Sequence, residues 1–223
     1  MKVPILTDWN ISTPTLFRYL PKQFVDQFFS NGYLRLSSFS QFHNHTDEQR
    51  LDKQEGKTLF VHRTYQGGGQ TFEALTEHGH DAYILSTSVR YGEDLLNKFG
   101  DSYIRINHST NFGVAISRQI PGLIAGFEGL CLYQNNKIIE KDLGYINLDM
   151  FKDSKHQNFN KSKLDGCINQ QMKHYPMFLK DKIFVNECEY RFVWFTNNKI
   201  SDYIDIEIPD AIQFCTPPNK LTE

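Results

Sequence analysis

Cysteine is scarce in this sequence, and no two cysteines have the spacing of a metal or redox motif. The four cysteines, Cys131, Cys167, Cys188 and Cys215, are scattered over a chain of 223 residues. Disulfide frameworks are typical of shorter secreted chains in which cysteine is much denser. We therefore expect the protein to work in a reducing compartment, and the cytoplasm is the expected location.

Long apolar runs are also missing. No segment approaches the roughly 18 consecutive apolar residues of a membrane-spanning helix. Residues 1–13 have neither the long apolar stretch nor the small-residue cleavage site of a signal peptide. We expect no membrane among the partners of this protein.

Neither positive nor negative charge is in large excess. The formal net charge is −2, which excludes the basic footprint of a protein that binds duplex DNA tightly without regard to sequence. A local basic groove, or binding of single strands by stacking, remains open. Aromatic residues are plentiful, with 18 Phe and 11 Tyr, so a packed core rich in strands is expected.

The hydrophobic pattern predicts more strands than helices. A first strand at 16–19 leads into a helix from Pro21 to Asn31, which Gly32 ends because glycine tolerates the left-handed cap. The next strand is expected at 33–36. Further strands are predicted at 58–62, 82–86, 102–107, 130–133, 137–140, 189–195, 203–208 and 212–214, helices at 93–99, 111–119 and 161–174, and loops at 42–57, 65–69 and 151–163.

These elements do not alternate regularly between strand and helix. An α+β fold with a largely antiparallel sheet is therefore expected, rather than a doubly wound parallel sheet. No internal repeat or interdomain linker is evident in the sequence. We expect a single domain over residues 1–223.

Three short motifs could carry chemistry. Glu187 and Glu189 stand two residues apart at the start of a strand, so strand alternation predicts that they share one face. Ser86-Thr87-Ser88 ends an apolar strand, and Arg18 lies within another, where it needs an anionic partner such as a carboxylate or phosphate. Each motif alone is also typical of surface acids, of hydroxyls bonded to local backbone, or of a structural ion pair.

Taken in order, Arg18, Ser86-Thr87-Ser88 and Glu187-Cys188-Glu189 resemble the signature of the ADP-ribosyltransferase superfamily, in its Arg–Ser–Glu class of bacterial toxin and defence enzymes. That class has an arginine on the first core strand, Ser-Thr-Ser at the end of a middle strand, and Glu-x-Glu entering a late strand. The resemblance implies a split, mostly antiparallel sheet with flanking helices. A looser similarity links the chain to bacterial domains of unknown function that share a Glu-x-Glu-Tyr-Arg-Phe strand.

The resemblance also implies roles for individual residues, with NAD as substrate and no metal. Glu189 would stabilise the positive charge that develops on the ribose, Ser86 would position Glu189 or the ribose, and Glu187 would orient or deprotonate the acceptor. Residues expected to bind NAD are Arg18, Tyr19, Ser86, Thr87, Ser88, Tyr91 and Phe99. Residues expected to bind the acceptor are Phe178, Phe184 and Glu187.

Several functions remain open on the sequence. The resemblance favours a mono-ADP-ribosyltransferase acting on a protein arginine or on an RNA or DNA base, as an intracellular toxin or phage-defence effector with a possible antitoxin partner. The same residues would serve an NAD glycohydrolase, with water as the acceptor. The aromatic strands would also suit a catalytically silent protein- or RNA-binding module.

Two histidine clusters have the spacing of zinc ligands. They are His43-x-His45 with Asp47, and Glu77-His78-x-His80. Both lie in polar segments, where solvated histidines are the commoner outcome, so no metal site is expected.

Overall fold

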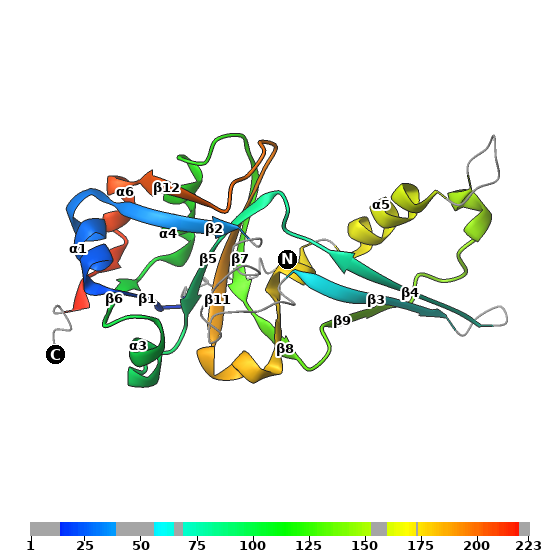
Figure 1. The fold of residues 1–223 in the computed structure, drawn as a ribbon, viewed down its shortest axis with the longest axis horizontal. Coiled ribbons are helices and arrows are strands. Elements are labelled where there is room, and N and C mark those ends of the chain that lie inside the picture. Colours follow the sequence, from blue (N-terminus) through cyan, green and yellow to red (C-terminus); the bar gives the residue numbers. More distant parts are fainter. Residues whose placement is uncertain (1–13, 39–55, 65–68, 153–159, 173, 219–223) are drawn as a thin grey trace, which may run out of the picture.

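The computed structural model describes residues 14–38, 56–64, 69–152, 160–172 and 174–218. The fold is α+β with a mostly antiparallel sheet, as the sequence predicts (Figure 1). The strands are β1 (Leu16–Leu20), β2 (Tyr33–Ser38), β3 (Lys57–Thr64), β4 (Gln70–Glu77), β5 (Ala82–Ser88), β6 (Ser102–Ile106), β7 (Leu123–Leu130), β8 (Leu132–Gln134), β9 (Ile138–Lys141), β10 (Leu179–Asp181), β11 (Glu189–Thr196), β12 (Tyr203–Glu207) and β13 (Cys215–Thr216).

The α-helices are short, and 3-10 turns connect several strands. The α-helices are α1 (Lys22–Asn31), α3 (Glu93–Phe99), α4 (Ser109–Ser117), α5 (Lys161–Met172) and α6 (Pro209–Ile212). The 3-10 helices are η2 (Leu148–Phe151), η3 (Tyr175–Phe178) and η4 (Lys182–Glu187). Among the residues that the structure describes, no helix combines the length and apolar character needed to cross a membrane.

Strand β5 is the centre of the main sheet, and the sheet divides along one of its edges. On one edge β5 pairs with β11 over its full length, and β7 extends the sheet beyond β11. The other edge is shared, because β1 pairs with the end of β5 at Ser88 and β2 pairs near its start at Tyr83 and Ile84. Every ladder in this sheet is antiparallel.

The two faces of the main sheet have different environments. Helices α1, α4 and α6 contribute apolar side chains to the largest core cluster on one face, where Tyr190, Phe192 and Trp194 of β11 also pack. Strand alternation places these three aromatic side chains together on this buried face. On the other face a smaller cluster joins Ala82, Ile84, Met177 and Val193, and Glu189, the acidic residue of β11, lies on this side.

A second, smaller unit lies beside the main sheet (Figure 1). Its sheet has β3 between β4, which is antiparallel to it, and β9, which is parallel. Helix α5 and the turn η2 pack on this sheet around a cluster of their own, made by Phe60, Phe151, Leu164, Ile168 and Met172.

Two predicted strands are placed wrongly. Residues 130–133 are not one strand, because Leu130 ends β7 and the chain then leaves the ladder with β11 to pair with β10 through β8. Residues 212–214 are instead the end of α6 and a turn, in which Phe214 N–H donates to the carbonyl of Ala211 at 3.2 Å. The strand follows at Cys215–Thr216.

Strands β4 and β7 are not predicted by the hydrophobic pattern. Strand β4 follows a run of glycines, and β7 contains Gly126 and Gly129, which lower strand propensity. The structure gives the reason for glycine in β7. A Cβ at Gly126 would lie 3.3 Å from Cδ1 of Trp194, so neighbouring aromatic side chains occupy that space.

Replacing Gly32 tests the close contact at the end of α1. Gly32 has φ 78° and donates its N–H to Phe28 at 2.7 Å, and a Cβ would lie 2.2 Å from the carbonyl carbon of Ile208. Gly32→Ala is expected to lower the free energy of unfolding by more than about 1–2 kcal/mol, since the clash adds to the left-handed backbone cost.

The matched control is Gly166→Ala in α5, where nothing lies within 4 Å of the new methyl group. There the change should raise the free energy of unfolding by about 0.5–1 kcal/mol, because alanine favours a helix interior. Urea denaturation of both variants measures the effect. Equal effects at the two positions would contradict the role of the Ile208 contact.

Candidate functional site

The structure brings Arg18, Ser86 and Glu189 into contact. The antiparallel register of β5 and β11 places Ser86 opposite Arg191 and Ser88 opposite Glu189, so all four side chains emerge on one face. The Ser86 hydroxyl donates to Oε1 of Glu189 at 2.6 Å. From β1, a guanidinium N–H of Arg18 donates to the carbonyl of Ser86 at 2.7 Å. Three motifs far apart in the sequence therefore form one site.

The two glutamates lie close together for a different reason from the predicted strand alternation. Glu187 is the last residue of η4, and Cys188 has a left-handed φ of 45°, so the chain turns sharply before β11 begins at Glu189. A positive φ is uncommon for residues other than glycine, asparagine and aspartate. The Ser88 hydroxyl supports the turn by donating to the carbonyl of Glu187 at 2.7 Å.

A single ammonium group links the two carboxylates. Lys180, in β10, donates from Nζ to Oε2 of Glu187 at 2.5 Å and also to Oε2 of Glu189. Lys98, in α3, donates to the other oxygen of Glu187 at 2.8 Å. Two neighbouring carboxylates would repel each other without such partners, so the cations offset that repulsion.

Glu189 is the most enclosed charge in this network. Its side chain is 4% exposed, and Arg191, which is 2% exposed, donates from Nε to its Oε1 at 2.8 Å. Burial alone would raise the pKa of Glu189, but the charges and hydrogen bonds of Arg191 and Lys180 outweigh it and hold that pKa far below the usual 4.5. Glu189 is therefore a carboxylate that stays ionised in a water-poor site.

Sequence reasoning missed the cations of this network. Arg191 could have been found, because it stands two residues after Glu189 in an apolar strand and a buried guanidinium needs an anionic partner. Lys98 and Lys180 carry no such signal. Their approach to the glutamates depends on how α3 and β10 pack, which the local sequence does not specify.

Three hydroxyls expected to bind NAD are bonded to the backbone around the site. Tyr19 donates to the carbonyl of Arg90 at 2.8 Å and accepts from the N–H of Gly92 at 3.0 Å. Thr87 donates to the carbonyl of Tyr190 at 2.7 Å, and Ser88 bonds as described above. These hydroxyls hold the segment after β5 and the start of β11 in place.

The four predicted aromatic residues differ in exposure. Tyr91 is 48% exposed, and its ring packs beside Phe17 and Tyr103. Phe184 is half-buried, and the ammonium groups of Lys180 and Lys98 lie 5.0 and 5.6 Å from its ring centroid. Phe99 and Phe178 pack against core clusters instead. Tyr91 and Phe184 are thus the better placed to meet a ligand.

Of the two histidine clusters with zinc-ligand spacing, Glu77-His78-x-His80 lies within the described residues. Among the residues that the structure describes, no group of three or more His, Cys, Asp and Glu side chains could hold a metal ion. His80 lies 4.0 Å from Glu77, while His78 bonds to the hydroxyl of Thr76 at 3.0 Å. His43, His45 and Asp47 lie outside the described residues.

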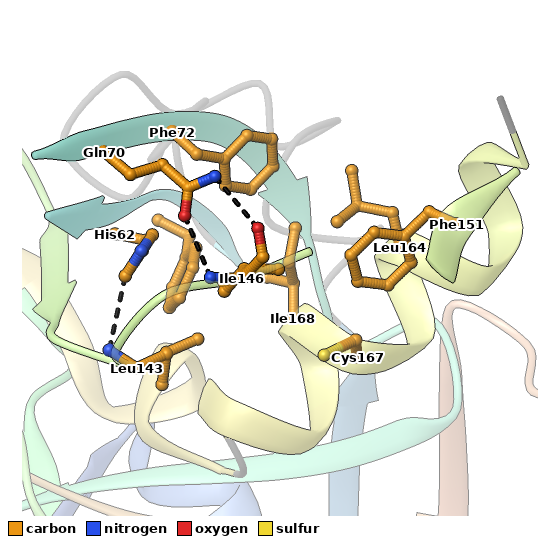
Figure 2. A pocket seen from close by; sticks show the side chains of 10 residues that line it. His62, Gln70, Phe72, Leu143, Ile146, Phe151, Leu164, Cys167 and Ile168 are labelled. Atoms are coloured by element: carbon orange, nitrogen blue, oxygen red, sulfur yellow. Dashed lines mark hydrogen bonds between the residues drawn. The ribbon is translucent and has the colours of Figure 1, made fainter. Parts of the chain in front are cut away.

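A small cavity lies in the second unit (Figure 2), and the polar side chains that line it bond to the backbone. It lies between α5 and the sheet of β3 and β4, and most of its lining is apolar. The Gln70 amide bonds both the N–H and the carbonyl of Ile146, each at 3.0 Å. His62 Nδ1 lies 3.3 Å from the N–H of Leu143. These polar groups secure the backbone that follows β9.

Comparisons with known proteins do not assign the chain to a family. An uncharacterized protein of Methanocaldococcus jannaschii is 27% identical over 168 residues, which is 75% of this chain. The match covers 33% of the archaeal protein, so the chain spans about a third of that protein's length. No family model matches the sequence. No solved structure matches it significantly.

The ionised state of Glu189 predicts how stability changes with pH. Because the folded protein has the lower pKa, the carboxylate contributes stability above about pH 4.5 and loses that contribution as the pH falls further. The difference in unfolding free energy between the wild type and Glu189→Gln should therefore narrow as the pH is lowered from about 7 to about 3. Urea denaturation across this range measures it, and a constant difference would contradict the assignment.

Removing the buried guanidinium of Arg191, the ion-pair partner of Glu189, tests the same network. Arg191→Met leaves Glu189 buried with only part of its compensation and removes the bond from Arg191 to the carbonyl of Met177, which is 2.5 Å long. The variant should lose about 3–5 kcal/mol of unfolding free energy, the usual cost of breaking a buried ion pair. Adding Glu189→Gln to this variant should restore part of the loss. A loss in the double variant equal to the sum of both single losses would contradict the coupling.

Proposed function

We propose that this protein is a mono-ADP-ribosyltransferase that moves ADP-ribose from NAD to a macromolecular acceptor. The observation that carries the proposal is the contact of Ser86 with Glu189 at 2.6 Å, with Arg18 bonded to the carbonyl of the same serine. These are the three residues on which the resemblance to the Arg–Ser–Glu class rests. Their convergence is what that function requires.

Glu189 is suited to stabilise positive charge. In the transfer, the bond between ribose C1′ and the nicotinamide nitrogen breaks, and the bonding electrons leave with nicotinamide. The ribose then carries positive charge, which a nearby ionised carboxylate stabilises. Ser86 and Arg191 hold Oε1 of Glu189, so Oε2 is the oxygen left for a ribose hydroxyl once Lys180 withdraws from it.

The surroundings of this carboxylate fit the rest of NAD. The guanidinium of Arg18 has the charge and planar shape that bind a pyrophosphate. The exposed ring of Tyr91 offers a surface on which a flat nicotinamide can stack. Both residues come from segments adjoining the end of β5, which Tyr19 fixes by its bonds to residues 90 and 92.

The proposal also covers the cellular location and the biological role of the protein. We place the activity in the cytoplasm, as a toxin or phage-defence effector with a protein antitoxin as a further partner. The scattered cysteines of the sequence, which lack the density of a disulfide framework, support a reducing setting.

Glu189→Gln should slow the transfer of ADP-ribose strongly. With labelled NAD and whole-cell lysate, the labelling rate is expected to fall at least about a hundredfold, the typical effect of removing one electrostatic group from an active site. Glu73→Gln is the matched control, because Glu73 is an exposed carboxylate on β4 in the second unit. It should label as the wild type does.

Other outcomes separate the remaining functions. Nicotinamide release without labelled macromolecules would favour an NAD glycohydrolase. Unchanged NAD with every protein would contradict the transferase and favour a silent binding module.

A further inference from the structure

We infer that the acceptor is single-stranded nucleic acid rather than an arginine side chain of a protein. This inference rests on the proposed transferase function and concerns the surface beside Glu187. Four groups carry it, and they come from two separate segments. They are the carboxylate of Glu187, the ammonium groups of Lys98 and Lys180, and the ring of Phe184.

Glu187 is poorly placed to receive a guanidinium group. An arginine acceptor binds a carboxylate best through two parallel hydrogen bonds, one to each oxygen. Here Lys98 holds Oε1 at 2.8 Å and Lys180 holds Oε2 at 2.5 Å, and the Glu187 side chain is 11% exposed. A guanidinium would have to displace two ammonium groups and then lie beside them, so like charges would oppose its approach.

The local charge balance favours an anionic partner instead. Three cations, from Lys98, Lys180 and Arg191, face the two carboxylates of Glu187 and Glu189. Cations from three separate positions thus gather at this point, although the whole chain has a net charge of −2. A phosphate backbone complements such a spot, and a neutral base meets no repulsion from it.

Apolar surface lies next to these cations. Phe184 has both ammonium groups within 5.6 Å of its ring centroid, and its neighbours Ile183 and Val185 are 77% and 43% exposed. Cations beside aromatic and apolar groups are the combination that binds single strands, with phosphates on the cations and bases on the rings. A base inside a duplex could not reach Glu189 without leaving its stack.

The transfer then uses a base as nucleophile. A base nitrogen that bears hydrogen, in the ring or exocyclic, forms the new bond to ribose C1′ as the bond to nicotinamide breaks, and its proton is released to solvent. In this arrangement Glu187 positions Lys98 and Lys180 for the strand, rather than binding the acceptor itself.

The test offers the full chain two kinds of acceptor with labelled NAD. One arm contains short single-stranded DNA and RNA oligonucleotides of mixed sequence, and the other contains histones as an arginine-rich protein. We expect label on an oligonucleotide and little on histones. The comparison of DNA with RNA identifies the natural strand.

Lys98→Gln tests the contact directly. The Lys98 side chain is 27% exposed, so the variant should fold, which a thermal melt checks. Oligonucleotide labelling should fall several-fold, and the slope of log affinity against log salt should weaken by about 0.7, the value for one lost phosphate contact on a single strand. Lys161→Gln, an exposed lysine of α5, is the control and should change neither.

The outcomes distinguish this inference from the proposed function. Label on histones and none on oligonucleotides would overturn the nucleic-acid acceptor and leave the transferase standing. Nicotinamide release without label on either acceptor would overturn the inference in favour of hydrolysis. If the wild type consumes no NAD with any acceptor, the proposed function itself fails. Equal salt slopes for wild type and Lys98→Gln would show that Lys98 makes no phosphate contact with the strand.

Discussion

The ionised carboxylate of Glu189, buried at the start of β11, is the constraint on which the site depends. A buried charge is costly unless it is paired and hydrogen-bonded, and Glu189 has three donors, from Ser86, Lys180 and Arg191. The three donors come from three strands, β5, β10 and β11. The packing of β5, β10 and β11 must therefore be correct for the carboxylate to be stable at all.

The division of the main sheet explains how Arg18 enters this network. Strand β11 occupies one edge of β5 completely, whereas β1 and β2 share the other edge. At the end of β5, where β1 approaches, the Arg18 guanidinium reaches the carbonyl of Ser86. The pairing of β1 with β5 and the approach of Arg18 to Ser86 thus occur at the same end of β5.

The turn at Cys188 gives the site its second carboxylate. The left-handed backbone of Cys188 separates the two glutamates, and residues held in sparsely populated conformations need support from their surroundings. Here the support comes from β5, since the Ser88 hydroxyl bonds to Glu187 and Val89 N–H bonds to the carbonyl of Cys188 at 3.0 Å. Lys180 then bridges both carboxylates, which couples the turn to β10.

The sequence by itself determined the fold class, most of the elements and the three motifs. Hydrophobic periodicity and the glycine at position 32 sufficed for β1, α1 and β2, because those signals are local. Strand β7 escaped prediction, since its glycines suit Trp194 and Phe178 rather than strand propensity. Only the tertiary structure decided that Lys98 and Lys180 meet the glutamates, and that a turn rather than strand alternation joins Glu187 to Glu189. Both depend on contacts between segments far apart in the chain, and such contacts cannot be derived from a single sequence.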